Sequence, residues 1–159
     1  MTTEKKEAQE FLMTEFLAKL ETRYDTGSVR GRFLTELRDH KKIWGIKCPS
    51  CKRIYSPPVT YCYACHGVQT TEWVEMGDEG VLQEFSIVMF PFIQPQTGQL
   101  EPLPWAHGVI LLDGGAFFQH RLVPPDPEKL KIGERYKAVW REGGRSGHFW
   151  DIQYFKKVE

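Results

Sequence analysis

Near the start of the chain, apolar side chains recur every four residues opposite charged positions and predict an amphipathic helix over residues 4–24. Such a helix would pack on its own domain or on a second copy, or it would dock a partner protein. Turn-forming residues at 25–28 are expected to end it, and a second helix with a basic end is predicted over about 31–41. The apolar stripe of the first helix consists of Leu12, Phe16, Leu20 and Tyr24.

After Trp73 the pattern changes to the alternation of apolar and polar positions that is typical of strands. Asp113-Gly114-Gly115 is a strong turn signal, so the second and third strands are expected to form a hairpin. A short helical turn is predicted over residues 124–130. Five strands with a helical element between the third and the fourth are the order of an OB-fold barrel. The predicted strands are 80–90, 106–113, 116–123, 135–142 and 148–157.

The first predicted strand leads into a long, apolar and proline-rich loop over residues 91–105. A loop of this length is usually functional or disordered. Its large apolar side chains are costly to leave in water, so we expect them to cover a partner, a ligand or the mouth of the barrel. These side chains are Phe92, Ile93, Leu103 and Trp105. In the strand itself, the side chains predicted to share one face are Val81, Phe85, Ile87 and Met89.

Every cysteine of the chain belongs to one of two Cys-x-x-Cys pairs that are separated by ten residues. Two such pairs can place four thiolates around one zinc ion, and this spacing favours a structural zinc ribbon. The alternatives are two disulfides, a redox-active Cys-x-x-Cys, or an iron–sulfur or rubredoxin-type iron site. The predicted metal ligands are Cys48, Cys51, Cys62 and Cys65.

Composition narrows the choice of compartment and partner. The 159 residues suffice for one ordinary domain or two small ones. Lys+Arg and Asp+Glu both total 21, and this neutrality weakens the hypothesis of indiscriminate nucleic-acid binding. The charged N-terminus leads into no apolar segment, so we expect no secretory signal. No stretch approaches 18 apolar residues, so we expect no membrane span. The expected location is the cytoplasm, where reduced thiols favour a metal over disulfides.

Little in the sequence points to catalysis by this chain alone. If all four cysteines bind zinc, none remains as a nucleophile, and a closed four-thiolate site has no position for an activated water. His107 and His120 have no nucleophile or orienting carboxylate that can be recognised in the sequence. The glycine-rich residues 143–147 lack the ending of a phosphate-binding loop and are interpreted as a hairpin turn.

Together these patterns predict a mainly β protein that has N-terminal helices, a four-cysteine zinc ribbon and then a five-stranded OB-fold barrel. The predicted division is a helical arm over residues 1–42, the ribbon over 43–74 and the barrel over 75–159.

The order of motifs in the middle of the chain resembles a known family. It is similar to the rubredoxin-like zinc ribbons that are fused to an acyl-CoA-associated OB-fold, over roughly residues 30–142. The ribbon followed directly by the barrel is the most specific part of this resemblance. The segments that carry it are the two cysteine pairs, Pro57-Pro58 between them, Glu72-Trp73-Val74, Gly80-Val81-Leu82, Arg121-Leu122-Val123 and Ile132-Gly133.

The resemblance implies an accessory role. Members of that family are small subunits of thiolase-superfamily complexes, in which they help acyl-CoA to bind while the partner supplies the reactive cysteine. The aromatic loop suggests a bulky or aryl acyl group, as in the small subunit of a benzoylsuccinyl-CoA-type thiolase. Residues expected to contact acyl-CoA or the partner are Arg38, Lys41, Lys47, Arg53, Phe90, Phe92, Trp105, His107 and Arg121.

Two other functions are compatible with the residues. OB-folds and zinc ribbons also bind single-stranded nucleic acid, with aromatic side chains that stack on bases inside a basic groove. Alternatively, the chain is a structural module that tethers a partner without touching the ligand of that partner.

Overall fold

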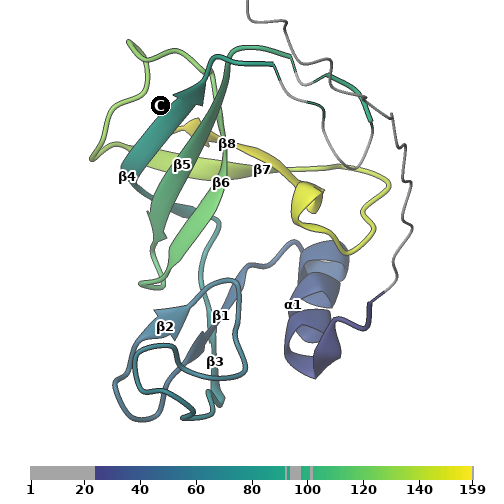
Figure 1. Ribbon diagram of the computed structural model, residues 1–159, viewed down its shortest axis with the longest axis vertical. Helices are drawn as coiled ribbons and strands as arrows, with labels where there is room; N and C mark the ends of the chain where they lie inside the picture. Colours follow the sequence, from purple (N-terminus) through teal and green to yellow (C-terminus); the bar gives the residue numbers. More distant parts are fainter. Residues whose placement is uncertain (1–23, 92, 94–97, 101, 159) are drawn as a thin grey trace, which may run out of the picture.

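The computed structural model describes residues 24–91, 93, 98–100 and 102–158. Along the chain it contains helix α1, a small three-stranded sheet and a closed five-stranded barrel (Figure 1). The predicted helix over residues 4–24 lies outside the described residues, apart from Tyr24. None of the helices in the described part is long and apolar enough to cross a membrane.

Helix α1 (Gly27–His40) begins four residues earlier than predicted. The residues expected only to break a preceding helix instead start this one, and the Asp25 carboxylate accepts a hydrogen bond from the Gly27 backbone N–H at 3.0 Å. The helix ends at Lys41, whose φ of 54° is left-handed. It buries Phe33 and Leu37 completely, so tertiary packing fixes this short helix in place.

The small sheet has the order β2-β1-β3, and all of its pairs are antiparallel. Its strands are β1 (Trp44–Lys47), β2 (Ile54–Tyr55) and β3 (Glu72–Glu75). The first cysteine pair lies between β1 and β2, and the second lies in the long connection between β2 and β3. The sheet therefore holds the ends of both cysteine-bearing segments together.

The barrel is closed in the order β4-β5-β6-β8-β7, which confirms the predicted OB-fold. The third and fifth strands, β6 and β8, pair in parallel, while the other neighbours are antiparallel. A short 3-10 helix, η1 (Phe149–Asp151), precedes the last strand. The barrel strands are β4 (Glu79–Val88), β5 (Trp105–Leu112), β6 (Phe117–Val123), β7 (Arg135–Trp140) and β8 (Ile152–Lys157).

The predicted apolar face of the first barrel strand, β4, is wrong at two of its four residues, Val81 and Met89. A register shift between Leu82 and Glu84 in the pairing of β4 with β5 marks a bulge, which changes the parity of the strand. Leu82, rather than Val81, is therefore the fully buried residue before the bulge. Phe85 and Ile87 do pack against the core, but Met89 lies beyond the strand and is 71% exposed.

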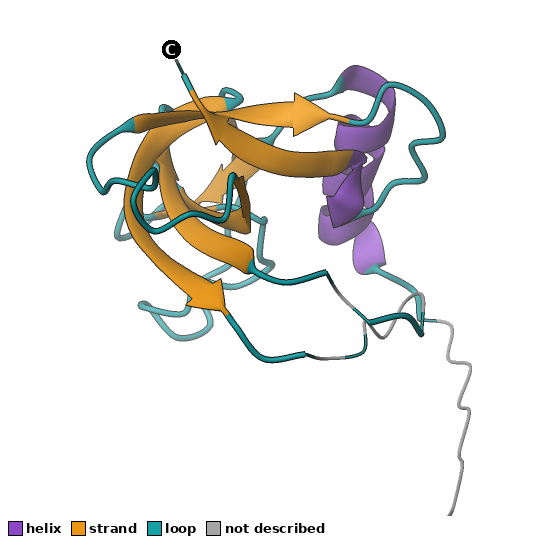
Figure 2. Cartoon of the chain, turned by 90° about the horizontal axis from the view of Figure 1, so that it is seen from above, coloured by secondary structure: helices purple, strands orange, loops and turns teal. Residues whose placement is uncertain are grey.

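One hydrophobic core includes side chains from the helix, the small sheet and the barrel. Phe33 and Ile43 are buried in the same cluster as Met76, Leu82 and Phe155. Figure 2 shows the helices, in purple, to one side of the barrel strands. The division into segments 1–42, 43–74 and 75–159 stays a prediction. Side chains from all three segments contribute to this one core.

The connection between β7 and β8 is more than the predicted hairpin turn. The carboxylate of Asp151, which is 2% exposed, accepts backbone N–H groups from Ser146, Gly147 and His148 at 3.0, 2.8 and 3.2 Å. Arg145 Nε donates to the Arg38 carbonyl at 2.6 Å, close to the end of α1. The connection is thus anchored to the helix and holds η1 against the barrel.

Candidate metal centre and ligand pockets

The structure brings the four predicted metal ligands together. The sulfurs of Cys48 and Cys65 are 4.0 Å apart and those of Cys51 and Cys62 are 3.6 Å apart. All four lie within 4.8 Å of one another. These separations are too long for a disulfide bond of about 2.0 Å.

The cluster fits a tetrahedral metal ion. Four sulfurs at about 2.3 Å from a zinc ion would be separated by about 3.8 Å, which lies inside the observed range. In each pair, the residue after the second cysteine has a left-handed backbone, with φ of 63° at Lys52 and 43° at His66. This conformation turns the chain back, so that both sulfurs of a pair face the same point.

The surroundings of Cys62 favour a thiolate. The hydroxyl of Tyr55 lies 3.2 Å from the Cys62 sulfur and can donate a hydrogen bond to it. This bond is the main reason that the pKa of Cys62 falls to about 6, and the Cys65 and Ala64 backbone contributes. A thiolate is the form that binds a metal. Hydrogen bonding to Cys51 raises the pKa of Cys65 to about 11, so the thiols of Cys62 and Cys65 differ in how readily they ionise.

The predicted ligand-contact residues do not form a single cluster. Three of the five predicted cations face acidic side chains: Arg38 pairs with Asp39 at 2.7 Å, Lys41 with Glu142 at 3.1 Å and Lys47 with Glu72 at 3.4 Å. Such pairs leave these cations less available to an anionic ligand. Phe90 is 66% exposed, and Phe92 lies outside the described residues.

Trp105, His107 and Arg121 do come together. They line a pocket of about 270 Å³ on the β5 and β6 strands, and η1 forms part of its wall. The second and third strands of an OB-fold, with the loops after the first and fourth, form its usual ligand-binding face. Here those loops correspond to residues 89–104 and 141–151. The other lining residues are Gln119, His120, Phe149 and Trp150.

His120 is a buried, neutral histidine inside this aromatic group. Its Nε2 can donate to the Phe149 carbonyl at 3.2 Å, and its ring stacks on Phe118 with centroids 6.1 Å apart. Burial lowers the pKa of His120 to about 4, and burial also lowers the pKa of His107. The His120 ring is therefore uncharged at neutral pH, and burial disfavours the charged form of His107 as well. The pocket is apolar and aromatic rather than acid–base in character.

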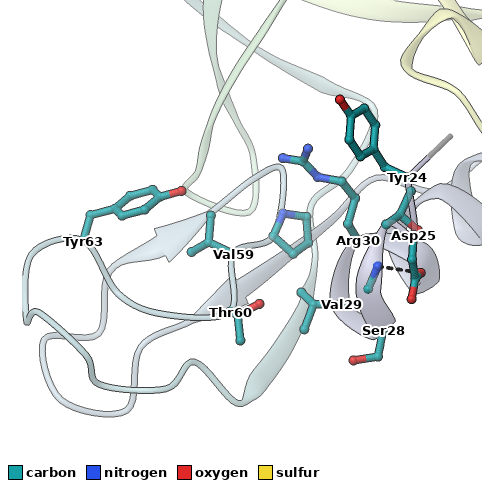
Figure 3. A pocket seen from close by; sticks show the side chains of 11 residues that line it. Tyr24, Asp25, Ser28, Val29, Arg30, Val59, Thr60 and Tyr63 are labelled. Atoms are coloured by element: carbon teal, nitrogen blue, oxygen red, sulfur yellow. Dashed lines mark hydrogen bonds between the residues drawn. The ribbon is translucent and has the colours of Figure 1, made fainter. Parts of the chain in front are cut away.

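A second hollow was not predicted from the sequence. It lies between the start of α1 and the ribbon segment Pro58–Tyr63 and has a volume of about 680 Å³ (Figure 3). A neighbouring hollow of about 650 Å³ is lined by Lys52, Arg53 and Phe117, among others. Both are lined by Arg30, Val59 and Tyr63, so they form one groove, which we call the ribbon groove. The predicted contact Arg53 lies here, away from Trp105.

Sequence comparison gives similarity over most of the chain. Residues 73–141 match the family model described as ChsH2, C-terminal OB-fold domain. A DUF35 domain-containing scaffold protein from Methanocaldococcus jannaschii is 26% identical over 126 residues, which are 77% of this chain and 86% of the relative. A scaffold protein of the same description from Methanothermobacter thermautotrophicus is 23% identical and covers 70% of this chain and 81% of its own length.

Solved structures show the same fold. A chain of the Ltp2-ChsH2(DUF35) aldolase aligns with a TM-score of 0.57 and 19% identity, over 84% of this chain and 98% of its own. A DUF35-family protein of unknown function from Sulfolobus solfataricus also aligns with a TM-score of 0.57, at 23% identity, over 84% of this chain and 87% of its own. Residues 73–141 thus match the ChsH2 C-terminal OB-fold family model, and most of the chain is similar to DUF35 domain-containing scaffold proteins.

Proposed function

We propose that this chain is a non-catalytic accessory subunit of a thiolase-like acyl-CoA enzyme complex, where it helps to bind the acyl-CoA and stabilises or activates the catalytic partner. The observation that carries the proposal is the likeness, over most of its length, to DUF35 scaffold proteins. The fold of a chain in an aldolase named for two components, Ltp2 and ChsH2(DUF35), supports the idea of a separate catalytic partner.

Zinc fits this role as a structural ion. When bound, it supplies folding energy to a small segment that has little core of its own. Cys48, Cys51, Cys62 and Cys65 would occupy all four tetrahedral positions. This chain's own residues then act by presenting surfaces: Tyr55 supports the thiolate of Cys62, and the small sheet joins the metal centre to the barrel.

The pocket on β5 and β6 is the proposed site for the acyl group. Its walls include the rings of Trp105, Phe149 and Trp150, which suit a bulky or aromatic acyl chain. His107 and Arg121 lie at the same pocket and offer polar contacts to the thioester or to a carboxylate on the acyl group. An aryl acyl-CoA, such as the benzoylsuccinyl-CoA of aromatic-compound degradation, is the substrate class that we propose.

The test begins with purification from the native organism and identification of the co-purifying protein. We expect a thiolase-superfamily enzyme that is inactive or impaired alone and regains activity when this chain is added. Trp150→Ala should raise the KM for acyl-CoA in the reconstituted complex, whereas Ile132→Ala, on an exposed turn outside the pockets, should not. Full activity of the partner alone, or thiolase activity of the isolated chain, would contradict the proposal.

A further inference from the structure

The ribbon groove carries a local positive charge in a chain whose formal net charge is zero. Arg30, Lys52 and Arg53 line it, all three are exposed, and within the described residues none of them forms an ion pair. Asp25 is the acidic residue in the groove lining, and its carboxylate already accepts the Gly27 N–H. The groove is therefore basic, although the chain as a whole is formally neutral.

Aromatic rings lie beside these cations. Tyr63 is 70% exposed and Phe117 is 59% exposed, although both are large side chains that folding normally covers. Figure 3 shows Tyr63 on the ribbon segment. The Arg30 side chain extends from α1 toward that segment. Exposed Tyr and Phe next to Arg are the composition of protein–protein interface centres, where a few such residues supply most of the binding energy.

The shape of the groove favours a protein segment over a small molecule. Small-ligand pockets bury most of the ligand surface. Here the rings that line the groove are themselves largely exposed, and two connected hollows of about 680 and 650 Å³ extend along it. An extended peptide segment uses such a surface well, because it spans several shallow positions in succession.

We propose that the ribbon groove docks an acidic segment of the catalytic partner, with carboxylates facing Arg30, Lys52 and Arg53 and with apolar side chains on Tyr63 and Phe117. The groove is built from α1, the ribbon and the turn that leads into β6. One bound segment would therefore contact all three parts of the chain. This inference rests on the proposed function only in naming the partner.

The first test places a photo-cross-linking residue, p-benzoylphenylalanine, at Tyr63 or Phe117 in the complex purified with its partner. Ile132, which is 63% exposed outside the groove, is the control position. We expect a cross-link from either groove position to a partner segment that contains several Asp or Glu residues. Cross-linking no stronger than at Ile132, or to a segment without acidic residues, would overturn the proposal.

The second test reverses charge. Lys52→Glu/Arg53→Glu should weaken partner binding about tenfold or more at low salt and abolish the cross-link, because like charges across an interface repel. The matched control is Lys131→Glu/Lys156→Glu, which makes the same charge change at exposed positions outside the groove and should bind normally. Unchanged zinc content and melting temperature exclude misfolding. Equal effects of the two double variants would contradict the proposal.

A nucleotide ligand is the competing occupant, and ADP is the probe for it. Binding of ADP that Arg53→Glu abolishes, with no protein cross-link at Tyr63, would assign the groove to a phosphorylated ligand and overturn the docking proposal. Failure of the docking proposal can be distinguished from failure of the proposed function. Suppose that the partner has no thiolase-superfamily activity but still cross-links through an acidic segment. That result would contradict the proposed function and would support the docking site.

Discussion

The guanidinium of Arg32 lies 4.3 Å from the centre of the Trp73 ring and joins α1 to β3. The same guanidinium is 5.6 Å from the ring of Trp44, and the two indoles meet edge to face at 6.4 Å. A cation placed over two rings stabilises the packing of the helix on the small sheet.

Arg32→Met keeps an apolar stem but removes the cation. We expect a loss of about 1 kcal/mol in the free energy of unfolding, the range found for cation–π contacts. Urea denaturation of the zinc-loaded protein measures it, and Arg32→Lys should lose less. An unchanged unfolding midpoint for Arg32→Met would show that the contact contributes nothing.

Asp151 should be among the most sensitive polar positions of the chain. Asp151→Ala leaves the N–H groups of Ser146, Gly147 and His148 without their acceptor, so we expect a loss of about 3 kcal/mol or more. Asp126→Ala is the matched control, since Asp126 accepts a single exposed backbone N–H, from Glu128, and should cost under about 1 kcal/mol. Similar losses in the two variants would contradict this account of the β7–β8 connection.

His120 predicts how stability changes with pH. Its pKa is about 4 in the folded protein, whereas an exposed histidine titrates near about 6.5. Between these values the unfolded chain binds a proton that the folded chain does not. Stability should therefore fall by up to about 3 kcal/mol as the pH is lowered through this window, and above it the effect vanishes.

His120→Gln is the variant that isolates this effect, because glutamine does not titrate and can still donate to the Phe149 carbonyl. Acid-driven release of the metal would affect both proteins alike. The unfolding free energy of the variant should depend less steeply on pH between about 6.5 and 4. Parallel curves for the two proteins would exclude His120 as the cause.

Metal analysis tests the cysteine cluster. The purified protein should contain one zinc per chain, and a strong chelator should unfold the ribbon, since the metal supplies its folding energy. Cys48→Ser should lose the zinc, whereas His66→Asn, outside the four-sulfur set, should retain it. Stoichiometric iron, or a ribbon that keeps its melting temperature without metal, would contradict the assignment.

Features set by short-range spacing were predictable from the sequence. Each Cys-x-x-Cys pair needs only a local turn to bring its two sulfurs together, and the OB-fold followed from the order of alternating segments. Features that depend on distant contacts were not. Lys41 was predicted to contact acyl-CoA or the partner, but it pairs with Glu142, which is 101 residues away. Phe149 and Trp150 joined the pocket through the β7–β8 connection, which Arg145 anchors to the carbonyl of Arg38, 107 residues away.

The β4 bulge illustrates a different limit. Alternation alone placed Val81 on the same face as Phe85, but the extra residue at the bulge moves Leu82 into the core instead. A single inserted residue reverses the parity of a strand, and it leaves no mark in a pattern of apolar positions.

Reconstitution with the native partner tests the central claim most directly. Acyl-CoA turnover is measured for this chain alone, for the partner alone and for the mixture. The account predicts no thiolase activity in this chain, little or none in the partner, and full activity in the mixture. Full activity in either protein by itself would contradict an accessory role.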